Sequence, residues 1–162
     1  MSDWQKRYQR LLFDRPHPKV LRVTMNRPDK YNATDSIMHT ELVNVWRDID
    51  GDDTVNCVII QGAGGKVFSA GGDFDLIEKN MKDFNALLRT WKEARDIVYN
   101  VINCSKPIVS TMRGPAVGAG LVAGILADVS IASKKASASE TVMPSTSAML
   151  RPRKVISSAS RL

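Results

Sequence analysis

The stretch IVSTMRGPAVGAGLVAGILADVSIA, residues 108–132, decides the fold. Its start, Ile108–Met112, is mostly apolar or β-branched and predicts a buried strand. Gly118–Ala127 is rich in Ala, Leu and Ile, which is typical of a short, tightly packed helix. Val129–Ala132 predicts another strand. A strand, a glycine turn, a helix and a strand in this order indicate α/β structure.

The same alternation is present upstream. Apolar and polar residues alternate over 21–25, which predicts a strand with one wet face. Apolar residues at helical spacing predict an amphipathic helix over 35–50, with Thr34 or Asp35 as its N-cap. The apolar run over 55–60 predicts a strand that is buried on both faces.

Residues 74–103 contain no Gly or Pro, and their apolar residues follow one helical stripe. One long helix or two consecutive helices fit this pattern. With the strands on either side, it predicts an α/β fold with mainly parallel pairing. From 136 to 162, seven of the 27 residues are Ser and no apolar period persists. We therefore expect a core over 1–135 and a Ser-rich, basic, poorly ordered tail over 136–162.

The composition is that of one ordinary soluble domain. With 162 residues, of which 43% are hydrophobic, the chain can bury a core. The net charge is +6, but no Lys/Arg stripe with interleaved aromatic residues suggests a nucleic-acid partner. The longest apolar run, 115–127, is too short to span a membrane. Cys57 and Cys104 lack the spacing of a metal site and predict reduced thiols, so we expect a cytoplasmic protein without a bound metal.

Two glycine-rich loops, 62–73 and 113–120, each follow a predicted strand and precede a predicted helix. Glycine permits positive φ and lets a ligand approach the backbone, while the first amides of a helix are unpaired donors. If the loops meet, they can aim amides at one oxygen atom.

Nucleotide-binding motifs fit these loops poorly. A P-loop would need Gly where Ile60 stands and Ser or Thr where Val67 stands. The variant GxGxxA of the dinucleotide fingerprint matches at 118–123, with Glu140 twenty residues past Gly120. Five residues, 113–117, separate that match from its strand, whereas the fingerprint normally follows its strand closely. An NAD-binding domain is therefore the weakest of the functions considered.

Several motifs occur in an order that resembles one family. They are NRPDKYNA at 26–33, FSAGGD at 68–73, KP at 106–107, GPAVGAG at 114–120 and AD at 127–128. Together they resemble the crotonase, or enoyl-CoA hydratase/isomerase, family over about residues 10–135. The resemblance implies a spiral of β-β-α units that binds an acyl-CoA thioester and polarises its carbonyl between two backbone amides.

The resemblance also implies roles for individual residues. The two oxyanion-hole amides would be those of Gly72 and Ala119, where preorganised donors are worth about 3–4 kcal/mol each. No cofactor is implied beyond the coenzyme A of the substrate. The remaining substrate-binding residues would be Lys30, Tyr31, Ala33, Ser69, Ala70, Gly71, Asp73, Gly118 and Gly120.

Simpler interpretations exist for some of these residues. Gly71 and Gly72 would also serve a tight turn, and Asp73 would cap a helix that begins at Phe74. Arg27 and Lys30 are either solvated turn residues or phosphate contacts. His17 and His39 are expected at the surface, without a catalytic partner.

The sequence departs from the family pattern at the acid–base residues. Hydratases of this family use two glutamates, whose places are taken here by Val122 and by the region of Val142, with Glu140 nearby. The catalytic acid or base is therefore unassigned, although the amides are retained.

The chain also lacks about a hundred residues that complete the family's spiral and its trimer contacts, as a truncated or frame-shifted product would. An incomplete spiral would expose an apolar face and a sheet edge, which predicts self-association. The resemblance likewise implies a homo-oligomer, a trimer or hexamer. The function expected first is an enoyl-CoA hydratase or isomerase; the alternative is a catalytically silent acyl-CoA-binding or oligomerisation module.

Overall fold

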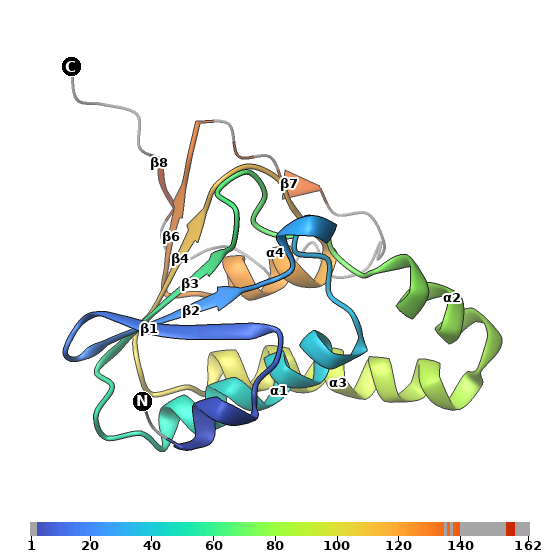
Figure 1. The fold of residues 1–162 in the computed structure, drawn as a ribbon, viewed down its shortest axis with the longest axis horizontal. Helices are drawn as coiled ribbons and strands as arrows, with labels where there is room; N and C mark the ends of the chain where they lie inside the picture. The colour runs from blue at the N-terminus through green and yellow to red at the C-terminus, as the bar shows by residue number, and fades with distance from the viewer. Residues whose placement is uncertain (1–2, 135, 137, 140–154, 158–162) are drawn as a thin grey trace.

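A six-stranded sheet forms the centre of the structure, a computed structural model that describes residues 3–134, 136, 138–139 and 155–157 (Figure 1). Its strand order is β1-β2-β3-β4-β6-β8, and only the β1–β2 pair is antiparallel. The parallel pairing that the sequence predicts is therefore confirmed. The strands are β1 (Leu11–His17), β2 (Val20–Met25), β3 (Cys57–Gly62), β4 (Ile108–Met112), β6 (Val129–Ala132) and β8 (Val155–Ser157).

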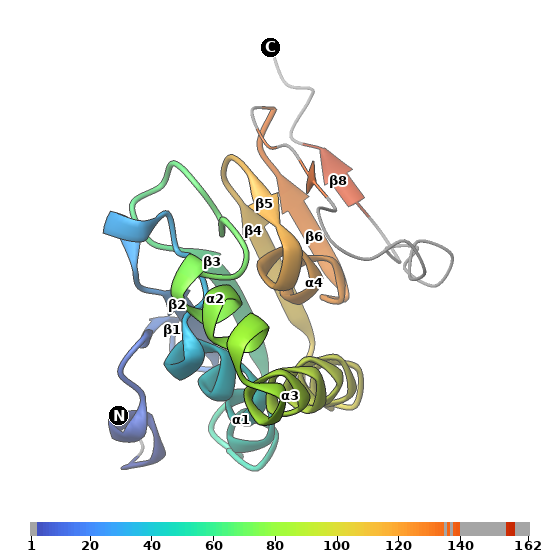
Figure 2. The same cartoon turned by 90° about the vertical axis from the view of Figure 1, so that its right-hand side faces the viewer.

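The helices lie on one side of this sheet, as Figure 2 shows. They are α1 (Ser36–Asp50), α2 (Phe74–Lys82), α3 (Phe84–Ile102) and α4 (Gly118–Ile125), and two 3₁₀ helices, η1 (Asp3–Arg7) and η2 (Pro28–Lys30), precede α1. α1 packs against α3, and α2 packs against α3. Within the described ranges, no helix is long and apolar enough to cross a bilayer.

Aspartate side chains fix where the helices begin. Asp35 caps α1, and its side chain accepts the Met38 amide at 2.8 Å. Asp83 has extended backbone angles and caps α3, which divides the predicted 74–103 helix into α2 and α3. The two-helix alternative is thus the correct one, because an aspartate that bonds the next free amides favours a new helix start.

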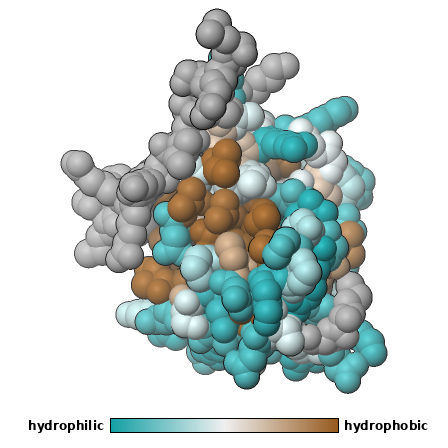
Figure 3. All heavy atoms as spheres, turned by 90° about the vertical axis from the view of Figure 1, so that its left-hand side faces the viewer, coloured by the Kyte–Doolittle hydropathy of each residue, from teal (hydrophilic) through white to brown (hydrophobic). Residues whose placement is uncertain are grey.

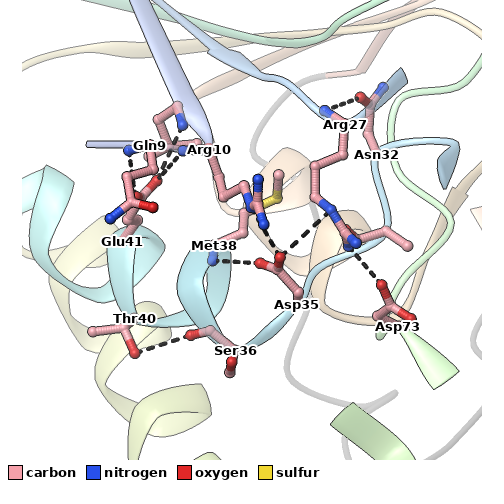
Figure 4. A network of polar contacts seen from close by, with 12 residues as sticks. Gln9, Arg10, Arg27, Asn32, Asp35, Ser36, Met38, Thr40, Glu41 and Asp73 are labelled. Atoms are coloured by element: carbon pink, nitrogen blue, oxygen red, sulfur yellow. Dashed lines mark hydrogen bonds and ion pairs between the residues drawn. The ribbon is translucent and has the colours of Figure 1, made fainter. Parts of the chain in front are cut away.

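β1 was not predicted, and a buried carboxylate explains its position. Glu41 of α1 is 8% exposed and accepts the backbone amides of Gln9, Arg10 and Leu11 at 2.6, 2.9 and 3.0 Å. This contact holds the start of the strand against α1 (Figure 4). β1 contains Pro16 and lies at the sheet edge, where a missing amide is tolerated.

One face of the sheet packs against the helices, and the other is open. Leu21, Val58 and Ile60 are fully buried, whereas Ile59 and Val109 are only half-buried. The prediction that the 55–60 strand is buried on both faces is therefore wrong, because the helices cover only one. Figure 3 shows apolar side chains gathered on the molecular surface, seen from the left of Figure 1.

A second, smaller sheet crosses the top of the fold. It pairs β5 (Ala116–Val117) in parallel with β7 (Ala138–Ser139). Two isolated parallel bridges extend it, Ser69 to Ala116 and Thr34 to Gly72. The predicted poorly ordered tail over 136–162 falls mostly outside the described residues, apart from β7 and β8.

The buried face of α1 should carry much of the stability. Leu42 is fully buried, so Leu42→Ala should lower the free energy of unfolding by about 2–5 kcal/mol in urea titrations. Ile37 on the same helix is 37% exposed, and Ile37→Ala should cost less than about 1 kcal/mol. Equal losses for the two variants would contradict the packing described.

Candidate functional site

Three backbone segments, 31–34, 69–73 and 115–118, lie side by side above the ends of the strands. The Thr34 amide donates to Gly71 O at 2.7 Å, and the Asp73 amide donates to Thr34 O at 3.0 Å. On the other side, the Val117 amide donates to Ser69 O at 2.9 Å. The first glycine loop is therefore held between residues 31–34 and the second glycine loop.

Two buried polar side chains lock this layer. Asn32, at φ 56°, donates through Nδ2 to Ala63 O and Val67 O, both at 3.0 Å. The Ser69 hydroxyl donates to Asn32 O at 2.9 Å and accepts the Gly71 amide at 3.2 Å. Ser69 is fully buried, so its side chain supports the loop from beneath. Asn32 was not predicted to have a role of its own, although Asn tolerates a left-handed turn.

The two glycine loops touch, which is the condition under which they can aim amides at one oxygen atom. Gly71 and Gly118 have φ of +90° and +53°, and a Cβ atom on Gly118 would lie 3.6 Å from Gly71 Cα. A Cβ atom on Gly120 would lie 2.2 Å from Ser69 Cβ, so only glycine fits at that position. The contact brings the start of α4 directly onto the loop that leads to α2.

The two amides singled out by the sequence lie at this contact. Gly72 is exposed and Ala119 is half-buried. Among the described residues, no acceptor is bonded to the Gly72 amide. Ala119 is the second residue of α4, where backbone amides lack intrahelical partners and the helix dipole is positive. Both groups are therefore donors available to a ligand oxygen.

The residues expected to hold coenzyme A lie beside the first loop. Lys30 ends η2 and is exposed, and Tyr31 is 63% exposed at φ 51°. Ala33 is half-buried and Ala70 is exposed, and the Ala70 amide donates to Tyr31 O at 3.0 Å. These positions form a surface next to Gly72 that includes one cation and one aromatic ring.

Arg27 connects the N-terminus of α1 with the N-terminus of α2 (Figure 4). Its guanidinium lies 2.7 Å from the Asp73 carboxylate and 3.5 Å from that of Asp35, and it donates to Ala33 O at 2.6 Å. The Arg27 side chain is 13% exposed, so it is a buried ion-pair residue and not a solvated turn residue. Asp73 also accepts the Asp75 amide at 3.3 Å and caps α2, as expected. The Arg27 hydrogen bond lowers the pKa of Asp73 below its usual value of 3.8.

The expectation that His39 lies at the surface is wrong. His39 is 3% exposed, and its Nδ1 lies 2.7 Å from the Glu93 carboxylate, so the pair joins α1 to α3. His17 is exposed, as expected. Val122, at the place of a family glutamate, lies half-buried in α4. Glu140 and Val142 lie outside the described residues.

The Arg27–Asp73 ion pair should make stability depend on pH. Asn also caps helices, so Asp73→Asn removes mainly the charge and should cost about 1.5–3 kcal/mol at pH 7. Because the pKa of Asp73 is lowered in the native state, its contribution is present above pH 3.8 and is lost as the pH falls through the native pKa. The two proteins should therefore converge in acid, as measured by urea unfolding between pH 7 and pH 2.

Asp83→Asn is the matched control, because Asp83 caps α3 through the Asn85 amide and has no cationic partner among the described residues. This variant should unfold like the unmodified protein at both pH values. A loss for Asp73→Asn that persists unchanged in acid would contradict the ion-pair explanation.

Known proteins resemble this chain over most of its length. The family model described as enoyl-CoA hydratase/isomerase matches residues 16–146. A probable enoyl-CoA hydratase of Mycobacterium tuberculosis is 36% identical over 115 residues, which are 70% of this chain and 43% of that protein. The 1,2-epoxyphenylacetyl-CoA isomerase of Escherichia coli is 27% identical over 121 residues, 72% of this chain and 45% of that protein.

A relative whose crystal structure is known has the same fold. The crystal structure of an enoyl-CoA hydratase/isomerase from Mycobacterium paratuberculosis superimposes with a TM-score of 0.75 at 31% identity, and the match covers 80% of this chain and 51% of that one. The chain thus spans about half the length of the relatives it matches. The predicted crotonase-like α/β fold is confirmed, and the chain belongs to the enoyl-CoA hydratase/isomerase family.

Proposed function

We propose that this chain binds an acyl-CoA thioester and polarises its carbonyl oxygen between the amides of Gly72 and Ala119, in the manner of an enoyl-CoA hydratase or isomerase. The contact between the two glycine loops supports the proposal, because a Cβ atom on Gly118 would lie 3.6 Å from Gly71 Cα, and Gly72 and Ala119 are the next residues of the two loops. Donors that are fixed before the reaction stabilise a developing oxyanion without reorganisation.

The surroundings of Gly72 suit the acyl part of such a substrate. A Cβ atom on Gly72 would lie 3.7 Å from the side chain of Ile77, which is 46% exposed on α2. Phe74, in the first turn of the same helix, is 86% exposed. These side chains offer apolar surface next to the two amides, and burying it against an acyl chain would favour binding.

The opposite side of the loop suits the coenzyme. Lys30 supplies a positive charge for a phosphate group, and the exposed ring of Tyr31 supplies a surface on which a base can stack. Both residues belong to the segment that is bonded to Ala70, one residue before Gly71. A ligand that extends from Tyr31 to Gly72 would therefore lie along residues 31–34 and 69–73, two segments that are hydrogen-bonded to each other.

No residue of the described chain is assigned as the acid or base for proton transfer. Val122 has no titratable group, so α4 supplies no acid or base at that place. The E. coli relative is named an isomerase of an epoxide thioester and other relatives are named hydratases, so proteins similar to this chain are named for more than one reaction of coenzyme A thioesters. The class best supported is chemistry at an enolisable thioester; hydration is one member of that class.

The same observation favours a second candidate function. With valine at position 122, the chain would act as a catalytically silent acyl-CoA-binding module. This candidate shares the binding geometry and differs only in turnover, so an enoyl-CoA hydration assay on the binding-competent protein separates the two. Turnover that depends on Gly72 supports the enzyme, and binding without turnover supports the module.

Self-association also fits the exposed apolar residues of α2 and α3. Met81 and Phe84 are 82% and 70% exposed at the turn between these helices, and Trp91 of α3 is 59% exposed. Exposed apolar side chains that cluster favour protein contacts. A homo-oligomer is therefore part of the proposal, and Trp91→Glu should shift the sedimentation profile toward the monomer.

The binding step is tested by calorimetric titration with acetoacetyl-CoA, whose thioester is enolisable. Gly72→Pro removes the amide and should weaken binding by about tenfold or more, since a hydrogen bond to a charged oxygen is worth about 1.5–3 kcal/mol. Gly72→Ala keeps the amide, and a Cβ atom there would make only ordinary contacts with Ile77, so it should bind like the unmodified protein.

A folding control accompanies the proline variant. Circular dichroism shows whether Gly72→Pro is folded, and amide NMR of the unmodified protein reports directly on Gly72 and Ala119. Ligand-induced shifts of both amides would support the proposal. Equal affinity of the proline and alanine variants, or absence of binding by the folded chain, would overturn it.

A further inference from the structure

A small cavity lies at the carboxyl ends of β3 and β4. Its volume is about 120 Å³, and its walls include Gln61, Gly64, Gly65, Thr111 and Arg113. In Figure 1 the loop that follows β3 is drawn in green. In open parallel sheets, ligands bind beyond the carboxyl ends of the strands, which is where this cavity lies.

The glycine turn gives the cavity a bare backbone wall. Gly64 and Gly65 have φ of +78° and +67°, a conformation that other residues rarely adopt. Both residues are exposed, and their amides donate to no acceptor in the described part of the chain. Successive amides in a turn form concave sites that attract anions.

Arg113 supplies the charge. A Cβ atom on Gly65 would lie 3.9 Å from Arg113 Nη1, so the guanidinium lies against the glycine turn. No ion pair of Arg113 is present among the described residues, and no acidic residue lines the cavity. A guanidinium offers a planar set of donors that matches two oxygens of a phosphate group.

We propose that this cavity binds a tetrahedral oxyanion, a phosphate group, between the Gly64–Gly65 turn and Arg113. Liquid water takes about 30 Å³ per molecule, so the cavity has room for a group the size of a phosphate. Gln61 and Thr111 also line the cavity. The Gln61 side-chain amide donates to Thr24 Oγ1 at 3.2 Å and keeps one further N–H for an anion, whereas the Thr111 hydroxyl donates to Ile60 O at 3.4 Å. The source is either free phosphate or a phosphate group of coenzyme A.

The cavity is separate from the proposed thioester site, but Asn32 connects the backbone segments of the two. Asn32 bonds Ala63 O and Val67 O on either side of the glycine turn, and the same residue supports Ser69. None of the residues that line the cavity is among those proposed to contact the thioester. The inference therefore does not rest on the proposed function, and the two can fail independently.

The test is an amide NMR titration of the full chain with inorganic phosphate at constant ionic strength. Saturable shifts of the Gly64 and Gly65 amides are expected, and Arg113→Gln should raise the apparent Kd about tenfold. Arg89→Gln removes the same charge from an exposed residue of α3 and should leave the titration unchanged. Linear shifts, or equal effects of the two variants, would overturn the proposal.

A second arm identifies the source of the phosphate. If coenzyme A shifts the Gly64 and Gly65 amides and competes with inorganic phosphate, the ligand group belongs to the coenzyme. If only inorganic phosphate shifts them, the site takes the free ion. If neither ligand gives saturable shifts in the folded protein, no oxyanion site is present. The shifts of Gly72 and Ala119 are read in the same spectra and report on the thioester site alone.

Discussion

The arrangement of the candidate site depends on a contact that leaves no room for a side chain. Gly120 lies against Ser69 so closely that a Cβ atom would come within 2.2 Å of its side chain. The hydroxyl of Ser69 in turn orders Asn32 and the Gly71 amide. Because Gly120 has no side chain, α4 can approach Ser69. The buried Ser69 hydroxyl then fixes the backbone of the first glycine loop through its hydrogen bonds. Close packing of this kind transmits small changes, because protein interiors have few voids to absorb them.

The sequence predicts the parts of this arrangement that depend on local pattern. The β3, β4 and β6 strands and α1, with Thr34 or Asp35 as its cap, follow from periodicity and capping, and the glycine residues mark the two loops but not their contact. Interactions between distant residues could not be predicted in this way. The Arg27–Asp73 ion pair and the His39–Glu93 hydrogen bond join residues 46 and 54 positions apart. No local pattern marks either pair, so His39 was expected at the surface and Arg27 either in solvent or in contact with a phosphate group.

The edges of the sheet were harder to predict for a related reason. A strand is recognised by the side chains it buries, and β1 buries Leu11 and Phe13 while it carries Pro16 near its end. Its position is fixed by Glu41, which is thirty residues from Leu11. The open face of the sheet was missed for a different reason. Ile59 of β3 and Val109 of β4 are apolar although no helix of the described chain covers them, so an apolar residue does not reveal which face of the sheet the helices cover. Burial on two faces and on one face give similar runs of apolar residues.

α2 has an unusual means of attachment, which bears on how a substrate would enter. None of its residues is buried, and it is held by its cap at Asp73 and by packing against α3. A segment with so little buried surface opens at a lower free energy than the core. The Asp73 cap shares Arg27 with the cap of α1, and near the other end of α2 the Thr90 hydroxyl of α3 donates to Asn80 Oδ1 at 3.1 Å, so α2 is held at both ends. Because α2 buries none of its residues, its position depends on these end contacts, and the apolar side chains that it presents beside Gly72 stay in place only while both contacts are intact.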